Sequence, residues 1–167
     1  GGPALSRLAA FGNAAAFDLP RPLMHSGDLD FSFAGLKTAV MTQHRKLGPA
    51  PGPQVLADLA ASTQAASGAV LVAKALQAWK VTGARRLVVA GGVGANRRLR
   101  EQLNAGAARL RAQVHYPPLA LCTDNGAIIA LAAALRLQQG LAEPLTSGAF
   151  DVRPRWPLDR IDEPAVA

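Results

Sequence analysis

The sequence has one cysteine, Cys122, and no long run of apolar residues. A single cysteine excludes an internal disulfide and a cysteine-rich zinc site, and it fits an intracellular compartment. No segment approaches the ~20 uninterrupted apolar residues of a membrane-spanning helix. No charged region followed by a short apolar run opens the chain, as it does in a signal peptide. We therefore expect a globular, cytoplasmic protein without a membrane span.

Aromatic and acidic residues are also scarce. Aromatics make up 5% of a chain that is 50% hydrophobic, so the core must consist of Ala, Leu and Val. The 167 residues are enough for one domain. Eighteen Lys and Arg against eleven Asp and Glu give a net charge of +7. This excess favours an anionic partner such as nucleic acid or a nucleotide, although a solvated basic surface from a coding bias towards Arg fits equally well.

The central feature of the sequence is a strand–glycine–helix pattern over residues 86–103, RLVVAGGVGANRRLREQL. Leu87–Ala90 is typical of a buried parallel strand, and Ala95–Leu103 has helical composition. Three glycines separate them: Gly91, Gly92 and Gly94. Such a turn lets backbone N–H groups and a helix N-terminus approach a phosphate. It is not a P-loop and fits the dinucleotide fingerprint only loosely, so a plain strand-to-helix connection remains an alternative.

The remaining elements alternate in type, which predicts an α/β fold. We expect a helix that begins at Pro3 after the Gly1-Gly2 turn, and a stiff proline-rich linker over residues 48–53. Further expected helices are Gly35–Leu47, Gln54–Lys80 and Ala127–Leu137. Expected strands are Asp30–Phe33 and Ala112–Tyr116, and Asp151–Leu158 reads as an extended surface segment.

Two polar side chains stand at predicted helix starts. Asp124, preceded by the N-cap candidate Thr123, either caps a helix or holds a metal ion. Asn96 either caps the helix after the glycine turn or hydrogen-bonds a ligand. Three arginines follow it, and they form either a solvated face or a phosphate contact: Arg97, Arg98 and Arg100. The three histidines are isolated and fit surface or packing positions better than metal ligation: His25, His44 and His115.

Five stretches, taken in order, resemble the C-terminal half of the bacterial tRNA adenosine threonylcarbamoyltransferase family, also called O-sialoglycoprotein endopeptidase or glycoprotease. They are GGPALSRLA, DFSFAGLKTAV, RLVVAGGVGANRRLREQL, CTDNGAIIALAAALR and VRPRWPL. Ala34 and Gly94 stand where the family often has Ser. The chain begins with Gly1 rather than Met, and we expect residues 1–167 to be a single C-terminal fragment of a two-lobed protein whose N-terminal lobe is absent.

The resemblance implies a helix-rich part of an actin/Hsp70-like ATPase (ribonuclease H-like) fold. The implied reaction moves a threonylcarbamoyl group from threonylcarbamoyl-AMP to the N6 amine of an anticodon-loop adenosine in tRNA. The implied partners are tRNA and the other proteins of the threonylcarbamoyladenosine synthesis complex. The ligand would be threonylcarbamoyl-AMP or an ATP-type nucleotide.

The resemblance also implies site residues. Substrate contacts fall on Gly2 and Asn96, and the turn with Gly91 and Gly92 forms one wall of a nucleotide cleft. One metal ion, iron or zinc, would be held by Asp124 and by two histidines of a His-x-x-x-His motif in the missing half. One carboxylate does not hold a metal usefully, so we expect the fragment alone to be inactive. The alternatives are a nucleotide- or RNA-binding module without chemistry and a metal-dependent endopeptidase.

Overall fold

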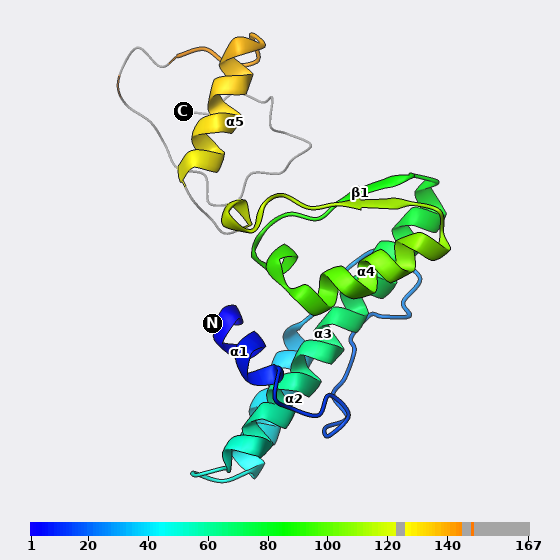
Figure 1. Cartoon of the computed structure of the whole chain (residues 1–167), viewed down its shortest axis with the longest axis vertical. Helices are drawn as coiled ribbons and strands as arrows, with labels where there is room; N and C mark the ends of the chain where they lie inside the picture. Colours follow the sequence, from blue (N-terminus) through cyan, green and yellow to red (C-terminus); the bar gives the residue numbers. More distant parts are fainter. Residues whose placement is uncertain (123–125, 145–147, 149–167) are drawn as a thin grey trace. The chain divides into compact units, whose positions relative to one another are not determined.

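The computed structural model describes residues 1–122, 126–144 and 148 (Figure 1). The chain divides into two compact units, Gly1–Thr123 and Asp124–Ala167. Within the described residues, helices dominate and the only sheet has two strands, so the predicted α/β class is confirmed in a helix-rich form.

The first unit is built on one long helix, α3 (Pro53–Thr82). Gly52 and Pro53 begin it, because the fixed φ of proline suits the first helical turn. Gly83 ends it with a left-handed φ of 66°, and its N–H donates to the Trp79 carbonyl at 2.9 Å. The prediction of Gln54–Lys80 is therefore confirmed to within two residues at each end.

Three other helices pack against α3: α1 (Gly2–Ala9), α2 (Ala34–Lys46) and α4 (Arg97–Arg109). The core between them consists of small and aliphatic side chains, as the scarcity of aromatics predicted, with Leu59, Ala66 and Val70 of α3 fully or almost fully buried. By length and composition alone, α3 is apolar enough to cross a membrane. The expectation of no membrane-spanning segment rested on the lack of an uninterrupted apolar run, so it did not include the overall apolar character of α3. Its packing against three helices is that of a core helix in a globular unit.

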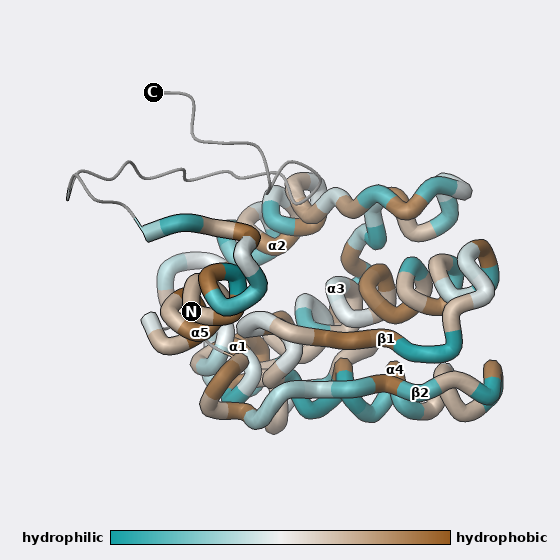
Figure 2. Tube along the Cα trace, turned by 90° about the horizontal axis from the view of Figure 1, so that it is seen from above, coloured by the Kyte–Doolittle hydropathy of each residue, from teal (hydrophilic) through white to brown (hydrophobic). Residues whose placement is uncertain are grey.

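The sheet joins β1 (Arg86–Val88) and β2 (Gln113–His115), with α4 as the connection between them. The strands are parallel, with Leu87 opposite Val114 (Figure 2). Both strands were predicted, and each is shorter than its predicted range, Leu87–Ala90 for β1 and Ala112–Tyr116 for β2. Since parallel strands point the same way, the segments that follow β1 and β2 lie at one edge of the sheet, and the segments that precede them lie at the other.

The prediction of a strand at Asp30–Phe33 is wrong. These residues have no regular secondary structure, because no strand among the described residues pairs with them. The alternation still places Phe31 and Phe33 together, with ring centroids 6.3 Å apart and planes 12° apart. The helix that follows, α2, begins at Ala34, one residue before the predicted start.

Helix α5 (Gly126–Gln138) belongs to the second unit. Its bounds confirm the prediction of Ala127–Leu137, and Gly140 follows it with a φ of 67°. It exposes large aliphatic side chains, among them Ile129 and Leu131. The predicted cap at Thr123 and the predicted extended segment Asp151–Leu158 lie outside the described residues.

Candidate functional site

The glycine turn lies at the carboxyl end of β1. Gly91 has a φ of 81°, a conformation that favours glycine over any residue with a side chain. A one-turn 3-10 helix, η1 (Gly92–Ala95), follows directly. Gly91 and Gly92 are exposed. Among the described residues, the N–H groups of Gly92 and Val93 find no acceptor. Two unpaired N–H groups on exposed residues at a helix start can donate hydrogen bonds to an anion such as phosphate.

The segment that follows β2 lies beside this turn. After Pro117 and Pro118 the chain forms η2 (Leu119–Leu121) and reaches Cys122, which is 1% exposed. A side chain added at Gly92 would place its first carbon 4.0 Å from the Cys122 carbonyl oxygen. The first residue of the CTDNGA motif is therefore a neighbour of the glycine turn. Asp124 lies outside the described residues, and its role as a metal ligand stays a prediction.

Arg100 links the glycine turn to the segment after β2. Its Nε donates to the Gly94 carbonyl, and one terminal nitrogen lies 3.4 Å from Cys122 Sγ and 3.5 Å from the Pro117 carbonyl. The guanidinium carbon stands 4.5 Å from the centre of the Tyr116 ring, a cation–π distance. Arg100 thus uses Nε and one of its two terminal nitrogens within the protein, a role that neither alternative for the arginine cluster included.

The hydroxyl of Tyr116 makes further contacts in the same region as Arg100. Its oxygen lies 3.3 Å from the Arg100 carbonyl oxygen and 3.1 Å from Asn104 Oδ1, and its one proton can be donated to either acceptor. Partial burial raises the pKa of Tyr116, and the positive charge of Arg100 opposes part of that rise. The phenol is thus held in its neutral form, in which its single proton can be donated to one of these two acceptors.

Asn96 caps α4, as one of its two predicted roles required. Its Oδ1 accepts from the Leu99 N–H at 3.0 Å, and its Nδ2 donates to Gln64 Oε1 of α3 at 2.9 Å. The side chain is half-buried and lies directly after η1. The contact with Gln64 fixes the end of the glycine turn against the long helix. A contact between Asn96 and a substrate stays a prediction.

Gly2 is the first residue of α1, separate from the glycine turn in sequence. It is exposed, and nothing lies within 4 Å of where its side chain would be. Figures 1 and 2 both place the amino end of α1 on the side of this unit where β1 ends. After α1 the chain crosses α3 so closely that a side chain at Gly12 would overlap the Ala57 carbonyl. The predicted substrate contact at Gly2 stays a prediction.

The sequence analysis missed a buried lysine, Lys74, in the middle of α3. Its side chain is 1% exposed, and Nζ donates to Ser26 Oγ at 2.8 Å, to the Asp28 carbonyl at 2.6 Å and to Asp28 Oδ1 at 3.0 Å. Hydrogen bonds from Ser26 and then from Lys74 lower the pKa of the Asp28 carboxyl. The only signal in the sequence was a lysine on the apolar stripe of a helix, four residues after Val70.

Metal ligation receives no support from the described part of the chain, where no three His, Cys, Asp or Glu side chains gather closely enough to hold a metal ion. The residues that the structure describes therefore do not form the implied iron or zinc site, and we derive no step through a metal.

Comparison with known proteins supports the family resemblance of the sequence motifs. Residues 1–131 match the family model described as TsaD, tRNA N6-adenosine threonylcarbamoyltransferase. The chain belongs to this family. A TsaD-family protein named tRNA N6-adenosine threonylcarbamoyltransferase from Acidovorax sp. (strain JS42) is 67% identical over 161 residues, which are 96% of this chain and 46% of that protein.

Two further relatives carry the same name. The protein of Verminephrobacter eiseniae is 69% identical over 95% of this chain and 46% of its own length. That of Bordetella pertussis is 61% identical over 95% of this chain and 47% of its own length. The chain thus spans about half the length of the curated TsaD relatives it matches. Its placement in the C-terminal half stays a prediction.

Proposed function

We propose that the chain is part of an enzyme that transfers a threonylcarbamoyl group to N6 of a tRNA adenosine, and that its glycine turn binds the phosphate of the adenylate donor. Full-length relatives are named for that transfer, and this chain belongs to their family. The observation that carries the proposal is the exposed turn at the carboxyl edge of the sheet, where the N–H groups of Gly92 and Val93 find no acceptor among the described residues. Ligands of parallel α/β sheets bind at that edge.

The proposal gives each part of the site a separate task. The N–H groups of Gly92 and Val93 donate hydrogen bonds to phosphate oxygens, while Gly91 supplies the left-handed φ that the turn requires. Asn96 has spare hydrogen-bonding capacity, because its amide can make more than the two bonds it makes here. Arg100 fixes the turn rather than touching substrate. We propose that the whole enzyme is two-lobed, actin-like and cytoplasmic. We also propose that it acts on tRNA together with the other proteins of the same synthesis complex.

Replacing Asn96 tests the nucleotide contact. Asn, Asp and Ser are similarly good N-caps, so Asn96→Asp keeps the bond to Leu99 while it puts a negative charge beside the proposed phosphate. In the full-length protein, we expect Asn96→Asp to lower tRNA modification at least about tenfold, mainly through a higher KM for the adenylate. Both Asn96→Asp and Asn96→Ser lose the bond from Nδ2 to Gln64, so the urea unfolding midpoint of Asn96→Asp should stay close to that of Asn96→Ser.

Asn96→Ser is the matched control, because it caps the helix without adding charge. It should retain more activity than Asn96→Asp. Unchanged transfer in Asn96→Asp would refute the nucleotide contact. Nucleotide binding without any transfer by the full-length protein would instead favour the alternative of a binding module without chemistry.

A further inference from the structure

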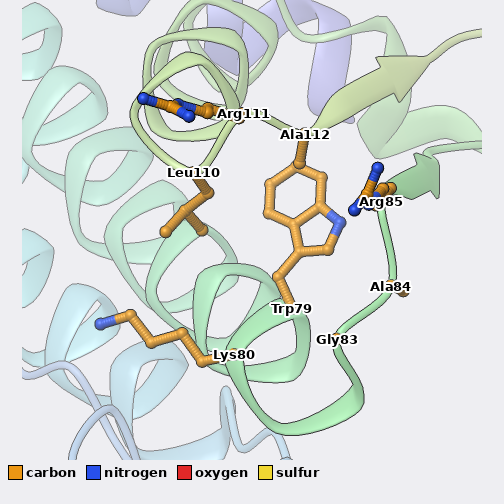
Figure 3. Close-up of a pocket in the computed structure, with 8 residues that line it drawn as sticks. All are labelled: Trp79, Lys80, Gly83, Ala84, Arg85, Leu110, Arg111 and Ala112. Carbon is orange, nitrogen blue, oxygen red and sulfur yellow. The ribbon is translucent and has the colours of Figure 1, made fainter.

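A cavity lies at the opposite edge of the sheet from the glycine turn. It has a volume of about 470 Å³ and opens between the end of α3, the approach to β1 and the turn from α4 into β2 (Figure 3). Residues 83–85 precede β1 and residues 110–112 precede β2, so this cavity is at the amino ends of both parallel strands. It shares no residue with the glycine turn.

Two unusual turns shape the cavity. Gly83 turns the chain out of α3 with a left-handed φ, and Arg111 has a φ of 52° that is uncommon for a residue with a side chain. The Ala112 N–H donates to the Ala107 carbonyl and closes this second turn. Both turns bring basic residues to the rim.

At the base of the cavity lies a buried hydrogen-bond donor without an acceptor. Trp79 is 5% exposed, and its indole Nε1 has no hydrogen-bond partner among the described residues. A buried donor without an acceptor lowers the stability of the folded state, so a ligand that supplies an acceptor is favoured. Figure 3 shows the indole nitrogen facing the side of the cavity where Arg85 lies. Two donors therefore face each other with no acceptor between them.

The rim carries only positive charge. Lys80, Arg85 and Arg111 are exposed, and no hydrogen bond or ion pair joins their side chains to the described residues. No carboxylate lines the cavity. A ligand that satisfies this site must bring negative charge and several acceptors.

We propose that this cavity binds a phosphate group, either a phosphodiester of an RNA backbone or a small phosphate ester. The donors come from three separate segments, and a tetrahedral phosphate presents acceptors in more directions than a planar carboxylate does. On binding, the unpartnered Arg85 guanidinium moves onto the phosphate, and the indole N–H of Trp79 gains an acceptor. This site is independent of the function proposed for the glycine turn.

Fluorescence of Trp79 reports directly on the cavity. The chain has two tryptophans, so Trp156→Phe leaves Trp79 as the single emitter. We would titrate this variant with inorganic phosphate and, separately, with a short single-stranded oligouridylate. A saturable change in Trp79 emission is the expected result for at least one probe.

Substitutions then locate the binding. Arg85→Gln should weaken the binding of the effective probe about tenfold, as loss of one charge-assisted hydrogen bond predicts. Trp79→Phe, followed by calorimetry, should weaken it about threefold to tenfold. Arg86→Gln is the matched control, because it removes the same charge one residue away from the cavity, and it should change the affinity less than about twofold.

The outcomes separate the sources of phosphate. Binding of RNA alone assigns a backbone phosphodiester, and binding of inorganic phosphate alone assigns a small phosphate ester; both support the site. No saturable change with either probe would overturn it, as would equal weakening by Arg86→Gln and Arg85→Gln, which indicates only diffuse charge. Asn96→Asp should leave the binding unchanged, so failure of this site and failure of the proposed function are distinguishable.

Discussion

Replacing Lys74 with methionine tests whether a buried cation fastens the loop over residues 23–30 to α3. Methionine keeps most of the apolar stem and removes the ammonium group. In the wild type that group makes three hydrogen bonds, all to Ser26 and Asp28. The Lys74 side chain is 1% exposed, whereas that of Asp28 is 48% exposed. The substitution therefore removes a buried charge, while water can reach its former acceptors.

The size of the effect follows from two opposing contributions. Each hydrogen bond to a charged group contributes about 1.5–3 kcal/mol, and taking an ammonium group out of water costs several kcal/mol. Because the acceptors can be hydrated again in the variant, they add little penalty. We expect Lys74→Met to lower the free energy of unfolding by about 2 kcal/mol, since the three bonds together outweigh the cost of burial.

Urea denaturation followed by circular dichroism measures this change, and amide hydrogen exchange locates it. Exchange should accelerate in residues 23–30 more than in α4. Lys80→Met is the matched control on the same helix, because Lys80 is exposed and has no partner among the described residues. It should change the stability by less than about 0.5 kcal/mol. A Lys74→Met variant as stable as the wild type would refute the argument that the buried cation anchors the loop.

Two other predictions concern packing and pH. Gly12→Ala should cost about 3 kcal/mol, because its new side chain would meet the backbone carbonyl of Ala57, while Gly52→Ala, in open space, should cost far less in the same urea titration. Tyr116 is the only tyrosine, and its raised pKa means that the unfolded chain, titrating near 10.0, releases its proton first. Stability should therefore fall as the pH rises through 10.0 and above. Tyr116→Phe should reduce that slope in urea titrations between about pH 9 and pH 11, and equal slopes would contradict the prediction.

The helices could be predicted because their signals are local. Proline and glycine at the ends of α3 fix its bounds within two residues, and apolar spacing identifies α2 and α5. The prediction of a strand at Asp30–Phe33 failed for the opposite reason. A strand forms only when it pairs with another strand, and the alternation of apolar and polar residues does not show whether such a partner exists. The predictions of β1 and β2 are confirmed because each strand pairs with the other, with α4 as the connection between them.

The parts of the candidate site that depend on backbone conformation could be predicted from the sequence, whereas the parts that depend on contacts between side chains could not. Two adjacent glycines, Gly91 and Gly92, indicate a turn from the local sequence alone. The contacts of Arg100 and Lys74 involve partners 22 and 46–48 residues away, so the local sequence did not predict them. Asn96 falls between these cases, because its cap to Leu99 is local and its bond to Gln64 is not.

The two ends of the sheet offer anions different means of binding, and this difference makes them separable. At the carboxyl end the donors are the backbone N–H groups of Gly92 and Val93, which no substitution other than proline removes, and the turn that presents them requires the left-handed φ of Gly91. At the amino end the donors are side chains, chiefly those of Arg85 and Trp79. Neutral N–H groups lose little affinity when salt screens charge, whereas a cationic rim loses much. Rising salt should therefore weaken the cavity first, while the glycine turn keeps its ligand.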